Sequence, residues 1–142
     1  MAQPFKGEQF RVLSANTGSQ EWMAPEQDIA NTVLLNCKID LGNFQEITPE
    51  AQESFKKAVP NLAFVDGKLA GDILINSQAY NIERFKLINS DTVWLTKDGT
   101  YGKLLDAYGE RGFTWGHYKD ILTKNELLML NVHLDNKGVY SA

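Results

Sequence analysis

The residues best able to carry chemistry gather between positions 109 and 120, in the stretch GERGFTWGHYKD. His117 stands next to Tyr118 and three residues before Asp120, and all three side chains can exchange protons. On an extended strand, however, His117 and Tyr118 point to opposite faces, so the fold would have to bring an orienting carboxylate to the imidazole. The sequence therefore leaves catalysis by His117 as a hypothesis and favours a packed or surface histidine.

Local motifs for metal, nucleotide or nucleophilic chemistry are absent from the sequence. No glycine-rich phosphate loop, nucleophile elbow or calcium loop occurs. The second histidine, His133, alternates with the aliphatic residues of LNVHLDN and should face away from them. Two histidines without a clustered third ligand, and the single cysteine Cys37, predict neither a metal site nor an intrachain disulfide. We expect no metal and no cofactor.

Large aromatic side chains and one arginine are the remaining candidates for binding. Trp94 alternates with Val93 and Leu95, so its strand is apolar on both faces, and GERGFTWGHYKD carries aromatic residues on both faces too. Two such strands are typical of a hollow barrel that contacts a ligand, and equally of a solid core. Arg84 shares a face with Tyr80 and could neutralise a ligand carboxylate. The predicted ligand-binding residues are Trp94, Trp115, His117, Arg84, Tyr80 and Tyr101.

Alternation of apolar and polar residues predicts that these side chains are held by a mainly β structure. The clearest strand runs over residues 33–41, which places Cys37 inward. Asp-Gly pairs suit two-residue turns, and they predict hairpins over 62–75 and 91–106. With the strands expected elsewhere, the total is about eight or nine.

One helix is predicted over residues 49–59. Thr48 suits the N-cap, Pro49 suits the first helical position, and Pro60 ends the helix. Strands joined in sequence by tight turns, with one early helix, predict a single domain over 1–142. We expect an antiparallel up-and-down meander that forms a barrel or half-barrel. The alternative is an α+β fold, an open antiparallel sheet covered by the helix.

The length and the meander order resemble those of the lipocalin and fatty-acid-binding superfamily. Barrels of that superfamily often carry Gly-x-Trp on the first strand, where this sequence reads Gly7-Glu8-Gln9-Phe10. The resemblance is one of architecture, and it implies a closed barrel around a small ligand.

Composition limits the classes of partner. The chain is 43% hydrophobic and 23% charged, with a net charge of −4 and scattered basic residues, so we expect no nucleic acid partner. No apolar run is long enough to span a membrane, and the sequence predicts a cytoplasmic protein, a leader cut from a secreted precursor being left open.

Three functions follow from these features. The first is a non-catalytic carrier or sensor of a small, largely apolar molecule. The second is a protein interaction module, such as an inhibitor, immunity or assembly factor. The third is an enzyme without a recognisable motif. We rank the enzyme last, and the sequence does not fix the ligand, the partner or the oligomeric state.

Overall fold

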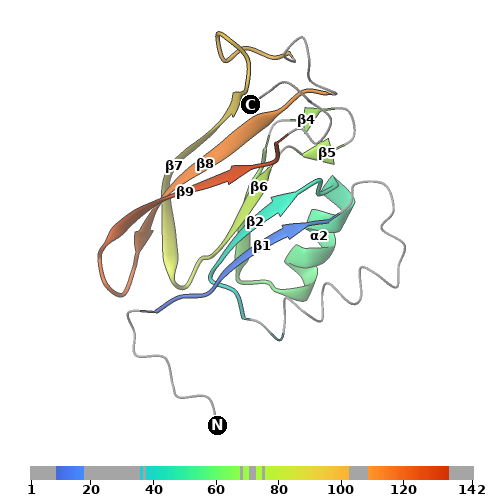
Figure 1. Ribbon diagram of the computed structural model, residues 1–142. Helices are drawn as coiled ribbons and strands as arrows, with labels where there is room; N and C mark the ends of the chain where they lie inside the picture. Colours follow the sequence, from blue (N-terminus) through green and yellow to red (C-terminus); the bar gives the residue numbers. More distant parts are fainter. Residues whose placement is uncertain are drawn as a thin grey trace.

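The computed structural model describes residues 9–17, 36, 38–67, 69–70, 73–74, 76–102 and 109–134. Within these residues one helix, a four-stranded sheet and a three-stranded sheet form successive layers (Figure 1). The elements are β1 (Val12–Asn16), β2 (Leu41–Gln45), α2 (Pro49–Ala58), β3 (Leu62–Val65), β4 (Leu69–Ala70), β5 (Ile73–Leu74), β6 (Ser77–Asn81), β7 (Phe85–Trp94), β8 (Gly112–Asp120) and β9 (Glu126–Val132).

The two larger sheets differ in strand direction. The four-stranded sheet has the order β1-β2-β6-β3, in which β1 runs parallel to β2 and the other pairs are antiparallel. The three-stranded sheet, β7-β8-β9, is antiparallel throughout. The short strands β4 and β5 pair only with each other.

Helix α2 covers the outer face of the four-stranded sheet. The Thr48 side chain accepts a hydrogen bond of 3.2 Å from the Ala51 amide, which satisfies one of the free N–H groups at the helix start. Phe55, 1% exposed, packs from the helix against Phe44 and Ile47 of the sheet side. The helix predicted over 49–59 is therefore confirmed, with its cap.

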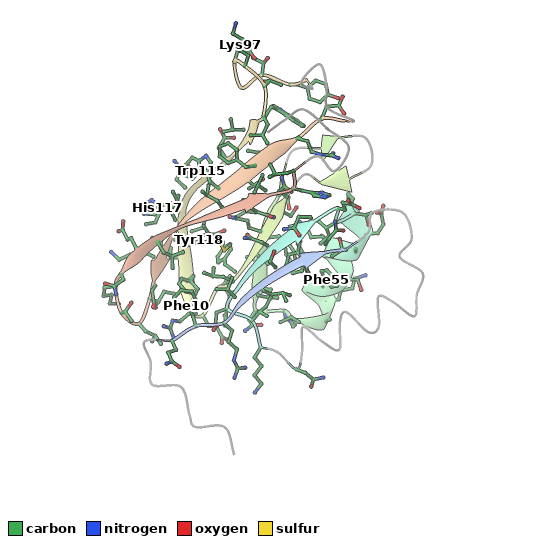
Figure 2. All side chains as sticks on the ribbon, in the orientation of Figure 1. Phe10, Phe55, Lys97, Trp115, His117 and Tyr118 are labelled. Carbon is green, nitrogen blue, oxygen red and sulfur yellow. The ribbon has the colours of Figure 1, made fainter. Side chains whose placement is uncertain are left out.

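The opposite face of the four-stranded sheet packs on the three-stranded sheet. The apolar part of this layer consists of Leu41, Val65, Phe85, Tyr118 and Met129. Figure 2 shows Phe55 on the helix side, while Trp115 and His117 lie on the far side of the molecule. The four-stranded sheet therefore has a core on each face.

The predicted barrel is wrong, since the described strands form two larger sheets packed face to face and the separate pair β4-β5, and they close no barrel. The alternative of one open antiparallel sheet under the helix also differs, because there is a second sheet and β1 is parallel to β2. A period-two pattern shows that a segment is a strand, but it does not show which strand lies beside it. The number of described strands agrees with the predicted number, whereas the pairing of the strands differs from the predicted meander.

The bounds and the partners of individual strands also differ from those predicted. The strand predicted over 33–41 does not extend through Lys38, whose φ of 47° is left-handed, and β2 begins only at Leu41. Cys37 lies outside the described residues, so its inward orientation stays a prediction. Instead of the hairpins over 62–75 and 91–106, β3 pairs with β6 and β7 pairs with β8. Among the described helical residues, none forms a segment with the length and apolarity that crossing a bilayer needs.

Candidate functional site

Amide and hydroxyl side chains, rather than apolar ones, occupy much of the space between the two sheets. We call the side chains that hydrogen-bond across this space the polar seam; they are Asn43, Gln45, Gln78, Tyr118 and Asn131. Gln78 is the centre of the seam, because its Nε2 donates to the Met129 carbonyl at 3.1 Å and its Oε1 accepts from the Tyr118 hydroxyl at 2.9 Å. Buried amides need partners of this kind to offset their desolvation.

The polar seam leads to one edge of the sheets, where three strands end. The parallel strands β1 and β2 end side by side, and β9 crosses to the same edge. Asn16 is the last residue of β1, Glu46 follows β2, and His133 follows β9. Polar side chains at strand ends are positioned by a rigid scaffold and remain accessible to solvent.

Glu46 stands at the centre of this group. Its Oε1 accepts a hydrogen bond of 3.3 Å from the Asn16 Nδ2. The Nδ1 of His133 lies 3.6 Å from the same oxygen, and the side chains of His133 and Glu46 are 31% and 30% exposed. The site therefore combines a carboxylate, an imidazole and an amide, all half-buried or accessible to water.

The backbone of Glu46 has an unusual conformation. Its φ of 56° is in the left-handed region, which costs a non-glycine residue about 1–3 kcal/mol and persists only where the surroundings hold it. Hydrogen bonds hold the preceding residue: the Thr17 amide and hydroxyl both donate to the Gln45 carbonyl, at 2.9 and 3.0 Å. Lys38, Asn76 and Lys124 also have a positive φ, so the conformation by itself does not distinguish Glu46.

The donor set fits a hard divalent cation better than zinc. The carboxylate of Glu46 and the amide oxygen of Asn16 are the oxygen ligands that Mg²⁺ prefers, and Mg²⁺ takes its other ligands from water and substrate phosphate. Within the part of the chain that the structure describes, no group of three or more His, Cys, Asp or Glu side chains could hold a metal ion. Glu46 and Asn16 are the residues of this site whose oxygen atoms could hold such a cation.

The six ligand-binding residues predicted from the sequence do not meet at this site. Trp94 is 6% exposed and its ring stands edge-on to Tyr101, 4.9 Å away, while Tyr101 is itself 64% exposed. Trp115 is half-buried on the outer face of β8, and His117 on the same face has its Nε2 3.0 Å from a Glu126 oxygen. The ligand-binding role of these residues stays a prediction.

Arg84 and Tyr80 lie elsewhere again. The Arg84 Nε and Nη2 each donate to Asp120 at 2.9 Å, so the arginine neutralises an internal carboxylate. The side chains of this pair are 11% and 5% exposed. Tyr80 packs against Tyr118, with ring centroids 5.4 Å apart. The sequence analysis did not predict the ion pair between Arg84 and Asp120.

Acid is expected to weaken the fold through Asp120. Burial alone raises the pKa of this carboxyl, but hydrogen bonds from Arg84, the Leu122 amide and Thr123 outweigh it and lower the pKa from 3.8 to about 2. Because the folded pKa is the lower one, the stabilisation is complete above pH ~4 and is lost as the pH falls towards 2, a change of about 2 kcal/mol. Urea unfolding between pH 6 and pH 2 measures it. Asp120→Asn should start from a lower stability and lose less in acid; an equal loss in both proteins would contradict this assignment.

Sequence reasoning missed two of the three site residues and undervalued the third. The sequence analysis does not single out Asn16 or Glu46. For His133 it predicts only an orientation away from the aliphatic residues and no metal site, and that orientation is as predicted. The available signal was positional, since each of the three follows a short β-rich run directly. No spacing rule connects them, because Asn16 meets Glu46 through the pairing of β1 with β2, and His133 joins from the other sheet.

No model of a known protein family matches the sequence, and no curated protein matches it either. Solved structures do match. An endonuclease/exonuclease/phosphatase from Bacteroides vulgatus has a TM-score of 0.73 at 18% identity, over 89% of this chain and 52% of that one. The mannosyl-6-phosphatase of Bacteroides thetaiotaomicron has a TM-score of 0.74 at 22% identity, over 89% of this chain and 52% of that one. D. rerio TDP2, complexed with a single-strand DNA product, has a TM-score of 0.68 at 16% identity, over 88% and 46% of the two chains.

These likenesses establish the fold, and the chain spans about half the length of the solved structures it matches. They also contradict the predicted non-catalytic carrier and the preference for a protein that is not an enzyme, because structures with this fold are described as phosphatases and nucleases. The packed polar seam between the sheets leaves the described strands no barrel interior for a carrier. The expected absence of a nucleic acid partner is contradicted as well, since one neighbour holds a single-strand DNA product.

Proposed function

We propose that this chain carries a phosphoester-hydrolysing site at Asn16, Glu46 and His133. The observation that supports it best is the convergence of Asn16 and His133 on one oxygen of Glu46, at 3.3 and 3.6 Å, where three strands end together. The structural neighbours described as phosphatases and nucleases support the same class of reaction. This chain spans about half of the length of these structures. That it carries out the same class of reaction as a whole protein of that kind is therefore also a proposal.

The three side chains have separate tasks in such a reaction. Glu46 is the residue that would hold a divalent cation, with the Asn16 amide fixing its carboxylate. A cation of this kind supplies charge stabilisation to the phosphoryl oxygens when it is bound. His133 directs Nδ1 to Glu46, which leaves the Nε2 side of the ring to meet a phosphoryl oxygen of the substrate. In the overall reaction a water oxygen bonds to phosphorus, the ester P–O bond breaks, and the leaving alcohol takes a proton.

The domain organisation and the cellular location of the chain are also proposals. A single domain over 1–142 is supported by the four-stranded sheet, which contributes to both apolar cores. A cytoplasmic location is supported by the lone Cys37, which has no other cysteine in the chain to pair with.

The proposal is tested by hydrolysis of p-nitrophenyl phosphate and of bis-p-nitrophenyl phosphate in the presence of Mg²⁺. Glu46→Gln keeps the size of the side chain but removes its charge, and we expect kcat/KM to fall about 100-fold. The melting temperature should hardly change, since Glu46 is partly exposed. The matched control is Glu53→Gln on the exposed face of α2, which should leave the rate unchanged.

Two outcomes would overturn this function. One is a wild-type protein that hydrolyses neither ester, and the other is a Glu46→Gln variant as active as the wild type. His133→Gln provides a second reading of the same site, and it too is expected to lower the rate.

A further inference from the structure

The side chain of Asn131 lies near the site but is not part of it, and all of its polar atoms form hydrogen bonds. It is 1% exposed, and its Nδ2 donates to the Phe44 carbonyl at 3.0 Å and to the Ser77 carbonyl at 2.8 Å. Its Oδ1 accepts from the Gln45 Nε2 at 2.6 Å. Both amide hydrogens and the amide oxygen are therefore used, and all three bonds cross from β9 to the other sheet.

Two of the three partners of Asn131 lie directly before Glu46 in the chain. Phe44 and Gln45 are the two residues before Glu46, and His133 is two residues after Asn131. The Asn131 side chain thus joins the two strand ends that supply the carboxylate and the imidazole. A second bond supports the same junction, because the Asn43 Nδ2 donates to the Leu130 carbonyl at 2.9 Å.

An apolar residue at position 131 could fill this space, but it could not fix the distance between the ends of β2 and β9. Apolar packing is non-directional, whereas hydrogen bonds lose strength steeply when their angles or lengths change. A buried amide destabilises a fold unless each of its polar atoms has a hydrogen-bond partner, and every polar atom of the Asn131 amide has one. The benefit is a defined distance between the ends of β2 and β9.

We propose that Asn131 is a positioning residue, whose side chain sets the 3.6 Å approach of His133 to Glu46 by tying the end of β9 to β2 and β6. The inference rests on the proposed function for its effect on rate. The geometry itself can be tested without any activity, because the chain contains only two histidines.

The test uses the ring proton resonances of the two histidines in solution NMR. Asn131→Leu has a similar size but no amide, and it should move the His133 resonances towards their positions in Glu46→Gln. His117, which pairs with Glu126 on the outer face of the three-stranded sheet, is an internal control and should not move. Tyr118→Phe is the matched variant, since it also removes one buried bond of the polar seam, between Tyr118 and Gln78. It should leave His133 in place.

Kinetics provide the second reading. A positioning role predicts that Asn131→Leu lowers kcat about tenfold with KM within about twofold, while Tyr118→Phe leaves kcat unchanged. Asn131→Leu removes one hydrogen-bond partner from each of three polar atoms. Gln45→Met removes only one of these bonds, so it is the milder variant and should shift His133 in the same direction.

The outcomes separate this inference from the proposed function. If His133 shifts in Asn131→Leu or Gln45→Met but the wild type hydrolyses no ester, the positioning geometry is supported and the function is lost. If the His133 resonances stay unchanged in every variant that folds, or move as far in Tyr118→Phe, the positioning role is overturned, whatever the activity.

Discussion

Gly116→Val is expected to prevent stable folding. Gly116 is buried in β8 and faces the polar seam, with no room for a side chain. A Cβ there would lie 2.5 Å from both the Gln78 Oε1 and the Tyr118 hydroxyl oxygen, and would also collide with the Tyr118 ring. Gln78 and Tyr118 are both 0% exposed and hydrogen-bond to each other, so neither can move aside cheaply.

The expected loss exceeds that of ordinary overpacking. Extra methyl groups in a core cost about 1–3 kcal/mol, and valine would in addition break the bond between Tyr118 and Gln78. We therefore expect a loss of at least about 4 kcal/mol, a large share of the stability of a domain of this size. Urea unfolding checks this for Gly116→Val and for the milder Gly116→Ala.

A glycine from the same stretch provides the control. A Cβ at Gly109 would lie 3.6 Å from the Arg111 Nη1, which is an ordinary contact, so Gly109→Ala should change stability little. If Gly116→Val unfolds at the same urea concentration as Gly109→Ala, the close packing of β8 on the seam is refuted. The close packing between the sheets is sufficient to explain why position 116 is a glycine.

Arg84→Met is expected to destabilise the protein by about 3–5 kcal/mol. The substitution leaves the Asp120 carboxylate, whose side chain is 5% exposed, without its cationic partner. An unpaired buried charge costs far more than the pair contributes, which is why removing one member is severe. The loss should be measured at pH 7, where Asp120 is ionised in the wild type, because its pKa is about 2.

Two further variants distinguish a buried pair from a general effect of removing charge. Lys56→Met breaks the 2.8 Å pair with Glu53, whose side chain is 61% exposed, and should destabilise the protein far less than Arg84→Met. The double variant Arg84→Met with Asp120→Asn should be less unstable than the sum of the single variants. Additive losses would count against direct coupling between Arg84 and Asp120.

Local features of the sequence predicted local structure well. Thr48, Pro49 and Pro60 mark the helix because capping and proline geometry act over a few residues. The alternation of GERGFTWGHYKD also predicted which side chains share a face: Thr114 and Tyr118 are buried, whereas Trp115 and His117 lie on the other face, half-buried. Both inferences needed no knowledge of the remote chain.

The same rule of alternation misleads on β9. An aliphatic stripe on a strand usually faces a core, but here it is exposed by 63% at Leu128 and 55% at Leu130, while Asn131 between the sheets is 1% exposed. Asn131 can be buried because Phe44, Gln45 and Ser77 satisfy it. Those partners are remote in sequence, so no local pattern reveals that the polar face is the inner one.

The candidate site was hidden for a related reason. Asn16 and Glu46 meet through the parallel pairing of β1 with β2, and His133 joins from the other sheet. Parallel pairing and packing between sheets leave no signature in short stretches of sequence, whereas a hairpin turn does. Each of the three residues is therefore ordinary in its own segment.

The polar seam has a mechanical consequence. Two sheets held by apolar contacts alone can slide past each other with little penalty, because such contacts have no preferred direction. Here a displacement of one sheet along the other would lengthen the bonds that Gln78 and Asn131 make across the layer, all at once. These bonds therefore resist shear between the layers, and the geometry of the candidate site at their shared edge is held by groups that lie well inside the protein.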